Sequence, residues 1–112
     1  MIRPAVLAPA ARLEFQKAAR WLARRNPDAA RKLRQATAEA AQLLGGRPIA
    51  GRRQPELVGP HYRLWSLSSF PYVLVYDPRP VPPQILRFLH TARDLPPLLA
   101  ERHDPPDADA AN

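Results

Sequence analysis

The apolar residues of this chain change spacing at about residue 60, from a helical period to short runs typical of strands. From Ala10 to Arg25 they recur at helical spacing, with Pro9 tolerated in the first turn. Asn26 can cap a second helix and Pro27 suits its first position. The pattern predicts two helices joined into an antiparallel hairpin, the second ending near Leu44. The residues predicted to face the core are Ala11, Phe15, Ala18, Ala19 and Leu22, then Leu33, Thr37, Ala40 and Leu44.

Gly45 and Gly46 follow the second helix, and one of them is expected to take the left-handed conformation that often ends a helix. The following residues, up to 60, are rich in Gly, Pro and Arg. We therefore expect residues 45–60 to be a connector that is ordered only in part.

Three short strands are predicted after the connector, over Tyr62–Leu67, Tyr72–Tyr76 and Gln84–Leu89. The segment Tyr72–Tyr76 is nearly all apolar, so it should be a central strand covered on both faces. Residues 77–83 contain four prolines and cannot pair as a strand. A weaker signal at residues 3–8 indicates one more strand, which Pro4 confines to a sheet edge or a strand start.

The predicted element order is β-α-α-β-β-β, an α+β fold with a helical hairpin on one face of a small, mostly antiparallel sheet. The other face is expected to be open or closed by a partner. Residues 1–100 should form one domain, because a chain of this length holds a single core. Residues 93–101 are expected to add a helical turn, and residues 101–112 to be a disordered acidic tail.

Charge divides the chain into a basic body and an acidic end. The whole chain carries +7 and the last twelve residues carry −3, so the first 100 carry +10. Such a body attracts acidic proteins or nucleic acid at long range, although a merely solvated surface fits equally well. There is no cysteine, the first residues lack the apolar core of a signal peptide, and no apolar run would span a bilayer. These features predict a cytoplasmic protein without membrane contact.

Few kinds of chemistry fit the residues. The three histidines lack metal-ligand spacing, and we find neither a nucleophile elbow nor a phosphate loop, so we expect no metal and no cofactor. Metal-free RNA cleavage needs an acid, a base and cations. Arg63, His90 and Arg93 are the candidates, together with Arg87. The alternative is that His90 and Arg93 only cap the strand end and pair with Asp94.

Pure binding is the second possibility. A basic stripe on the first helix and two arginines in the connector would then meet an acidic protein or nucleic acid, unless they simply form a solvated face. Together with two residues of the strands, the positions predicted to bind a partner are Lys17, Arg20, Arg24, Arg52, Arg53, Trp65 and Arg87.

Several motifs, taken in order, give a resemblance to the RelE/ParE toxin superfamily of bacterial type II toxin–antitoxin systems, closer to ParE. It covers residues 3–100. The motifs are Pro27–Asp28–Ala29–Ala30 at the start of the second helix, Gly51 before the sheet, Tyr62–Arg63 opening it, the strand FPYVLVY, and FLHTARD followed by LPPLL.

This resemblance implies a toxin held inactive by an antitoxin encoded next to it, in a hetero-oligomer. ParE-like members inhibit DNA gyrase without chemistry of their own, whereas RelE-like members cut messenger RNA on the ribosome. Relative to the RelE pattern, this chain keeps Arg63 and Arg93 but has Trp65, Val73 and Leu99 where two basic residues and a Tyr are expected. The leading hypothesis is therefore a gyrase inhibitor. The alternatives are a ribosome-dependent endonuclease and a non-toxic member that acts only as a binding partner.

Overall fold

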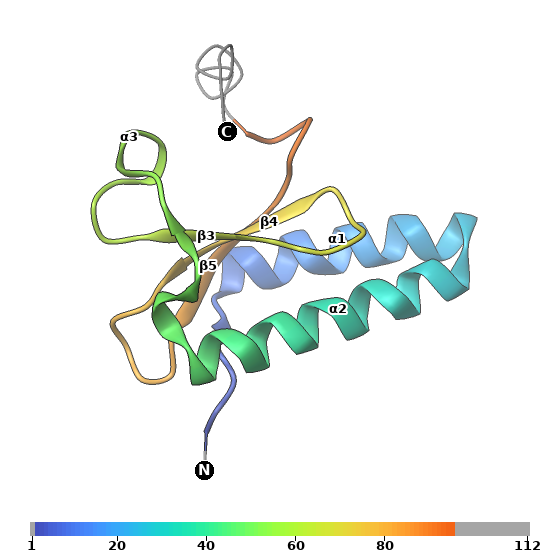
Figure 1. The fold of residues 1–112 in the computed structure, drawn as a ribbon. Helices are drawn as coiled ribbons and strands as arrows, with labels where there is room; N and C mark the ends of the chain where they lie inside the picture. The colour runs from blue at the N-terminus through green and yellow to red at the C-terminus, as the bar shows by residue number, and fades with distance from the viewer. Residues whose placement is uncertain (1, 96–112) are drawn as a thin grey trace.

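Two long antiparallel helices lie against one face of a five-stranded sheet in this computed structural model, which describes residues 2–95 (Figure 1). The sheet is antiparallel except for its first strand, which runs parallel to its neighbour. The α+β class and the helical hairpin are thus confirmed. The helices are α1 (Pro9–Arg25) and α2 (Pro27–Gly46), and the strands in spatial order are β1 (Val6–Leu7), β5 (Gln84–His90), β4 (Tyr72–Asp77), β3 (Arg63–Ser66) and β2 (Arg52–Arg53).

The hairpin forms where the apolar period and the capping residues predict it. The Asn26 side chain accepts a hydrogen bond from the Ala29 N–H at 3.1 Å, and Pro27 occupies the first turn of α2. All four predicted core positions of α2 are buried, and Ala30 joins them. On α1 the predicted alanines are buried, while Phe15 and Leu22 are partly buried against the same core.

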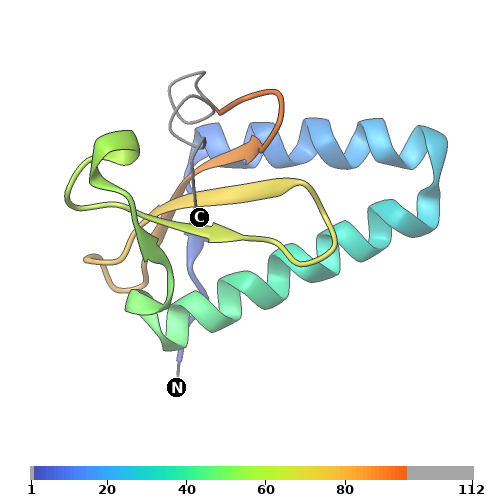
Figure 2. The ribbon, with the colours of Figure 1, turned by 45° about the horizontal axis from the view of Figure 1, so that its top comes forward.

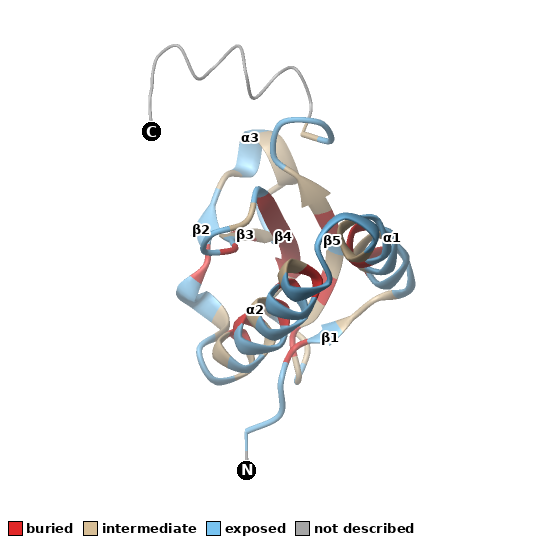
Figure 3. Cartoon of the chain, turned by 90° about the vertical axis from the view of Figure 1, so that its right-hand side faces the viewer, coloured by how far each residue is buried: buried red, intermediate tan, exposed pale blue. Residues whose placement is uncertain are grey.

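Strand β4 is the centre of the sheet, as its sequence predicts. Residues 72–76 are all buried, and Figure 3 shows β4 in the colour of buried residues. Tyr76 of this strand has no exposed surface, so its hydroxyl group needs hydrogen-bond partners inside the protein. Its hydroxyl donates to the Pro48 carbonyl at 2.6 Å and accepts from the Gly51 N–H at 2.8 Å. A Cβ on Gly51 would lie 2.6 Å from that ring, so the close approach requires glycine.

This anchoring corrects the prediction of a partly ordered connector. The segment after α2 forms a 3₁₀ turn, η1 (Pro48–Ala50), then β2 and a one-turn helix, α3 (Pro55–Val58). Strand β2 pairs antiparallel with β3 and extends the sheet by one strand. Two exposed arginines carry no apolar period, so no sequence pattern indicated a strand there.

The second face of the sheet is also partly covered, contrary to the expectation of an open face. Leu64, Val73 and Val75 form a second apolar cluster there, and Leu57 and Val58 of α3 pack against it. The expected strand at residues 3–8 is confirmed as a two-residue edge strand. Residues 91–94 form a turn, whereas most of the helical turn expected over 93–101 and the tail predicted for 101–112 lie outside the described residues.

Gly45 has a different role from the one its sequence position predicts. Neither it nor Gly46 has a positive φ, so no left-handed residue ends α2. The N-terminal segment instead passes directly over the end of this helix (Figure 2). A Cβ on Gly45 would lie 2.1 Å from the Arg3 carbonyl oxygen, a backbone atom that cannot easily move away.

Replacing this glycine tests the crossing, and the neighbouring glycine supplies a matched control. We expect Gly45→Ala to lower the free energy of unfolding by about 1–3 kcal/mol because the added methyl group overpacks the crossing. A Cβ on Gly46 would meet only the Ile2 side chain at 3.6 Å, an ordinary contact, so Gly46→Ala should change it by no more than about 0.5 kcal/mol. Urea unfolding of both variants measures the difference, and equal midpoints would contradict the crossing.

Candidate functional site

A groove of about 960 Å³ lies between α1 and the ends of β4 and β5. Its floor is apolar and its rim is charged. The floor is formed by Ala18, Leu22, Phe70, Tyr72 and Phe88, with Trp21 at its side, and the rim by Glu14, Lys17, Arg87, His90, Arg93 and Asp94. Four of the predicted site residues, Lys17, Arg87, His90 and Arg93, therefore meet at one place.

Aromatic packing shapes the floor. Phe88 stacks on Tyr72 with ring centroids 4.8 Å apart and meets the Phe15 ring edge-on at 5.5 Å. Trp21 lies at the side of the groove with 49 % of its surface exposed, and the Arg25 guanidinium lies 4.0 Å over its ring. An exposed tryptophan beside an apolar floor is typical of a surface that binds another protein.

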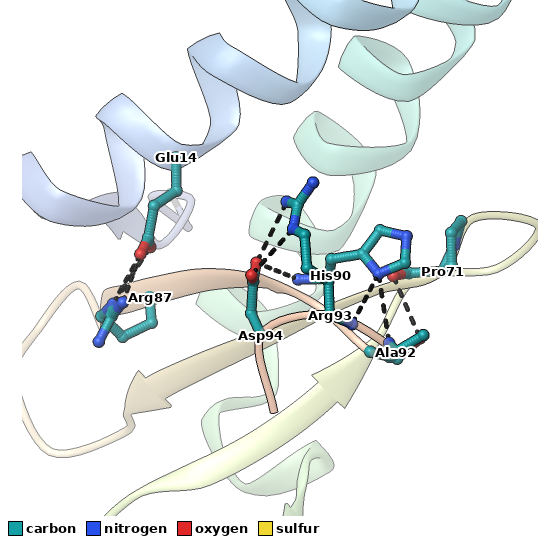
Figure 4. A network of polar contacts seen from close by, with 8 residues as sticks. Glu14, Pro71, Arg87, His90, Ala92, Arg93 and Asp94 are labelled. Carbon is teal, nitrogen blue, oxygen red and sulfur yellow. Dashed lines mark hydrogen bonds and ion pairs between the residues drawn. The ribbon is translucent and has the colours of Figure 1, made fainter. Parts of the chain in front are cut away.

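Glu14 ties α1 to the outer edge of β5 (Figure 4). Its carboxylate accepts hydrogen bonds from Arg87 Nε at 2.9 Å and from Arg87 Nη2 at 2.5 Å, and one from the Phe88 backbone N–H at 2.9 Å. The pairing raises the pKa of Arg87 above its ordinary value. The Phe88 N–H points away from β4, so this carboxylate occupies a position that a further strand would otherwise take.

The polar cluster at the end of β5 is held together by its own hydrogen bonds. His90 Nδ1 accepts from the backbone N–H groups of Ala92 and Arg93, at 3.2 and 3.1 Å (Figure 4). The Asp94 carboxylate accepts from the His90 backbone N–H at 2.9 Å and from Arg93 Nε at 3.0 Å. The Arg93 guanidinium and then the His90 N–H hold the pKa of Asp94 below its usual range.

These hydrogen bonds determine which ring nitrogen of His90 is free to act as an acid or a base. A ring nitrogen that accepts hydrogen bonds carries no hydrogen, so the neutral imidazole carries its hydrogen on Nε2. Nδ1, the nitrogen with the free electron pair, is already occupied by the turn. The alternative of a strand-end cap therefore describes the geometry of His90, Arg93 and Asp94.

Arg63 is not brought to this cluster. It pairs with Tyr76 at one end of β4, whereas His90 pairs with Tyr72 at the other end. Four residues of strand separate the two positions by about 13 Å. The Arg63 guanidinium donates instead to the Gly51 carbonyl at 2.9 Å, so it supports the connector beside Tyr76.

The residues predicted to bind a partner lie in separate places. Lys17 and Arg87 are on the groove rim, while Arg20 and Arg24 are exposed on α1. Arg52 and Arg53 are exposed on β2 at the far edge of the sheet. Trp65 packs against the main core. Sequence reasoning missed the groove floor as a site, and its one available signal was Trp21 beside the apolar face of α1.

Two other kinds of site find no support in the described residues. Among residues 2–95, no group of three or more His, Cys, Asp or Glu side chains is placed to hold a metal ion. No helix in that range is long and apolar enough to cross a membrane.

Comparison with known proteins decides the family. Residues 5–95 match the family of the ParE toxin of the type II toxin–antitoxin system parDE. The chain belongs to this ParE toxin family. Membership confirms the resemblance and places the chain in a toxin–antitoxin system, which gives it an antitoxin as a partner.

A solved structure shows the same fold. A chain of the chromosomal ParDE toxin–antitoxin system from P. aeruginosa superposes with a TM-score of 0.66 at 20% sequence identity. The match covers 80% of this chain and 96% of that chain. No curated protein matches the sequence.

Acidification tests whether Asp94 holds the strand-end turn. Its folded pKa lies below the unfolded value of about 3.9, so its contribution is present above that pH and is lost as the pH falls through the folded pKa. We expect Asp94→Asn to cost at most about 1 kcal/mol at about pH 6 and to cost less at about pH 3. Urea unfolding at both pH values measures this. If Asp94→Asn lowered the free energy of unfolding by the same amount at both pH values, the role given to the carboxylate would be contradicted.

Proposed function

We propose that this ParE-family chain acts as a toxin by inhibiting DNA gyrase, without cutting RNA, and that its antitoxin neutralises it by binding the groove along α1. The single observation that carries the choice of target is that the candidate ribonuclease residues form structural hydrogen bonds. His90 and Arg93 are bonded into a turn, and Arg63 supports the connector at the opposite end of β4.

Cleavage of RNA without a metal needs an acid, a base and cations gathered around one phosphate. In the described residues, the His90 ring accepts a hydrogen bond from the backbone of the turn, and the Arg93 guanidinium donates to Asp94. The third candidate is about 13 Å away along the sheet. This arrangement favours a protein that acts by binding over one that acts on a phosphodiester. No observation favours the endonuclease as a second candidate.

The groove supports the second half of the proposal. It joins an apolar, aromatic floor to a rim on which Lys17 has no ion pair among residues 2–95, while Arg87 and Arg93 are already paired. The basic body around it would steer an acidic segment toward the groove, and burial of Trp21 and the floor would then hold it.

Purified components test the target directly. The full chain should inhibit ATP-dependent supercoiling of relaxed plasmid by purified gyrase, and the product of the neighbouring antitoxin gene should relieve the inhibition. Translating ribosomes incubated with the same chain should keep their messenger RNA intact. Cut transcripts together with unaffected gyrase would overturn the proposal in favour of the endonuclease. Activity in neither assay would favour the non-toxic binding partner.

A pair of substitutions on α1 tests the groove as the antitoxin site. Trp21→Ala should weaken antitoxin binding by about 30-fold, or about 2 kcal/mol, because truncating an aromatic anchor has that cost. Leu13→Ala is the matched control, since Leu13 is 61 % exposed on the same helix and does not line the groove. Isothermal titration calorimetry measures both affinities, and equal losses would place the antitoxin elsewhere.

A further inference from the structure

The helical hairpin carries a surplus of positive charge that its own carboxylates do not neutralise. Residues 9–46 contain eight Lys and Arg residues and three carboxylates, a net charge of +5. The carboxylates are already engaged, Glu14 by Arg87, Asp28 by Arg31 and Lys32, and Glu39 by Gln35. Among residues 2–95, the hairpin cations that remain without an ion pair are Arg12, Lys17, Arg20, Arg24, Arg25 and Arg34.

Three of these cations, Lys17, Arg20 and Arg24, form a basic ridge on the side of α1 that faces away from the core. An α-helix turns by about 100° per residue, so Arg20 lies about 180° around α1 from the buried Ala11, and Arg24 about 140° from it. Lys17, which also borders the groove, lies about 120° from Ala11. All three cations are exposed. Figures 1 and 2 show the hairpin extending beyond the sheet at the junction of α1 and α2, the end nearer the basic ridge.

The side chains around the basic ridge favour a phosphate backbone as its ligand. Leu13 is the one large apolar residue on this side of α1, and Trp21 lies at the groove instead. Protein partners are held mainly by aromatic anchors, and single-stranded nucleic acid is held by stacking on aromatic rings. Arginine forks match phosphate oxygens, and the backbone of a double helix is bound largely by charge. A nucleic-acid duplex is therefore the ligand that suits this surface.

We propose that the basic ridge contacts the phosphate backbone of duplex DNA without reading its sequence. The choice of DNA rests on the proposed function, because gyrase acts on a DNA duplex that an inhibitor bound to it would meet. The ridge rises by about 10 Å from Lys17 to Arg24. Duplex DNA carries about six phosphates in that length, so each of the three cations has a phosphate to contact. The contact needs no gyrase and can be measured with the chain and DNA alone.

The salt dependence of DNA binding tests the basic ridge. Fluorescence anisotropy of a short labelled DNA duplex gives the affinity of the full chain between about 50 and 200 mM salt. Each neutralised phosphate adds about −0.9 to the slope of log K against log salt concentration, so Arg20→Gln with Arg24→Gln should weaken binding and make the slope shallower by about 1.8. Arg20→Lys with Arg24→Lys keeps both charges and should keep the slope. The matched control is Arg52→Gln with Arg53→Gln, which removes two exposed charges at the far edge of the sheet and should also keep the slope.

Three outcomes would overturn the proposal. Equal changes of slope for the ridge pair and the β2 pair would mean that DNA responds only to net charge. Tighter binding to a single strand of the same length would exclude the duplex as the ligand. Ridge variants that bind DNA like the parent chain but lose antitoxin affinity would assign the ridge to the antitoxin. Because these samples contain no gyrase, a failed gyrase assay would leave the DNA result unchanged, and a failed DNA result would leave gyrase inhibition standing.

Discussion

The structure depends on the burial of β4 on both of its faces. A strand without a solvent face needs pairing partners on both edges and apolar cover on both sides. Strands β3 and β5 supply the edges, and the hairpin covers one face. Within residues 2–95, the other face is covered by α3, Tyr62 and Leu95. The hydroxyl of Tyr76 also needs partners, and it finds them in Pro48 and Gly51, which fixes the connector and allows β2 to form.

The same requirement explains the polar groups at the sheet ends. Backbone N–H groups on the outer edge of β5 lie beyond the reach of β1, so side chains satisfy them: Glu14 at Phe88 and Asp94 at His90. Arg87 and Arg93 neutralise those two carboxylates. Side chains that resemble a catalytic set in the sequence therefore complete a sheet edge, and the adjoining groove keeps an apolar floor suited to a protein partner.

Local patterns made most of the fold predictable. The period of 3.6 along residues 10–44 and the Asn26–Pro27 start depend only on neighbours in the sequence, and so does the apolar run Tyr72–Tyr76. The missed features depend on distant residues. Gly45 is needed because Arg3 crosses it, Arg63 turns to the Gly51 carbonyl, and Glu14 meets Arg87 across 73 positions. The spacing of apolar residues along the sequence cannot predict such contacts.

In the candidate site, too, features that depend on sequence neighbours were predictable and features that depend on distant residues were not. His90, Arg93 and Asp94 are close in sequence, and their clustering was predictable as a strand-end cap. The apolar lining of the groove was not predictable, because Trp21, Phe70 and Phe88 come from three segments that only the folded sheet brings together.

The central claim is that the chain acts by binding its target and not by cutting RNA. The most direct measurement is the order of events in growing cells after the full chain is induced without its antitoxin. DNA-damage reporter activity and incorporation of labelled amino acids are followed in the same culture. We expect the DNA-damage response to rise while protein synthesis continues. Protein synthesis that stops first, with transcripts cut at codon boundaries, would contradict the account.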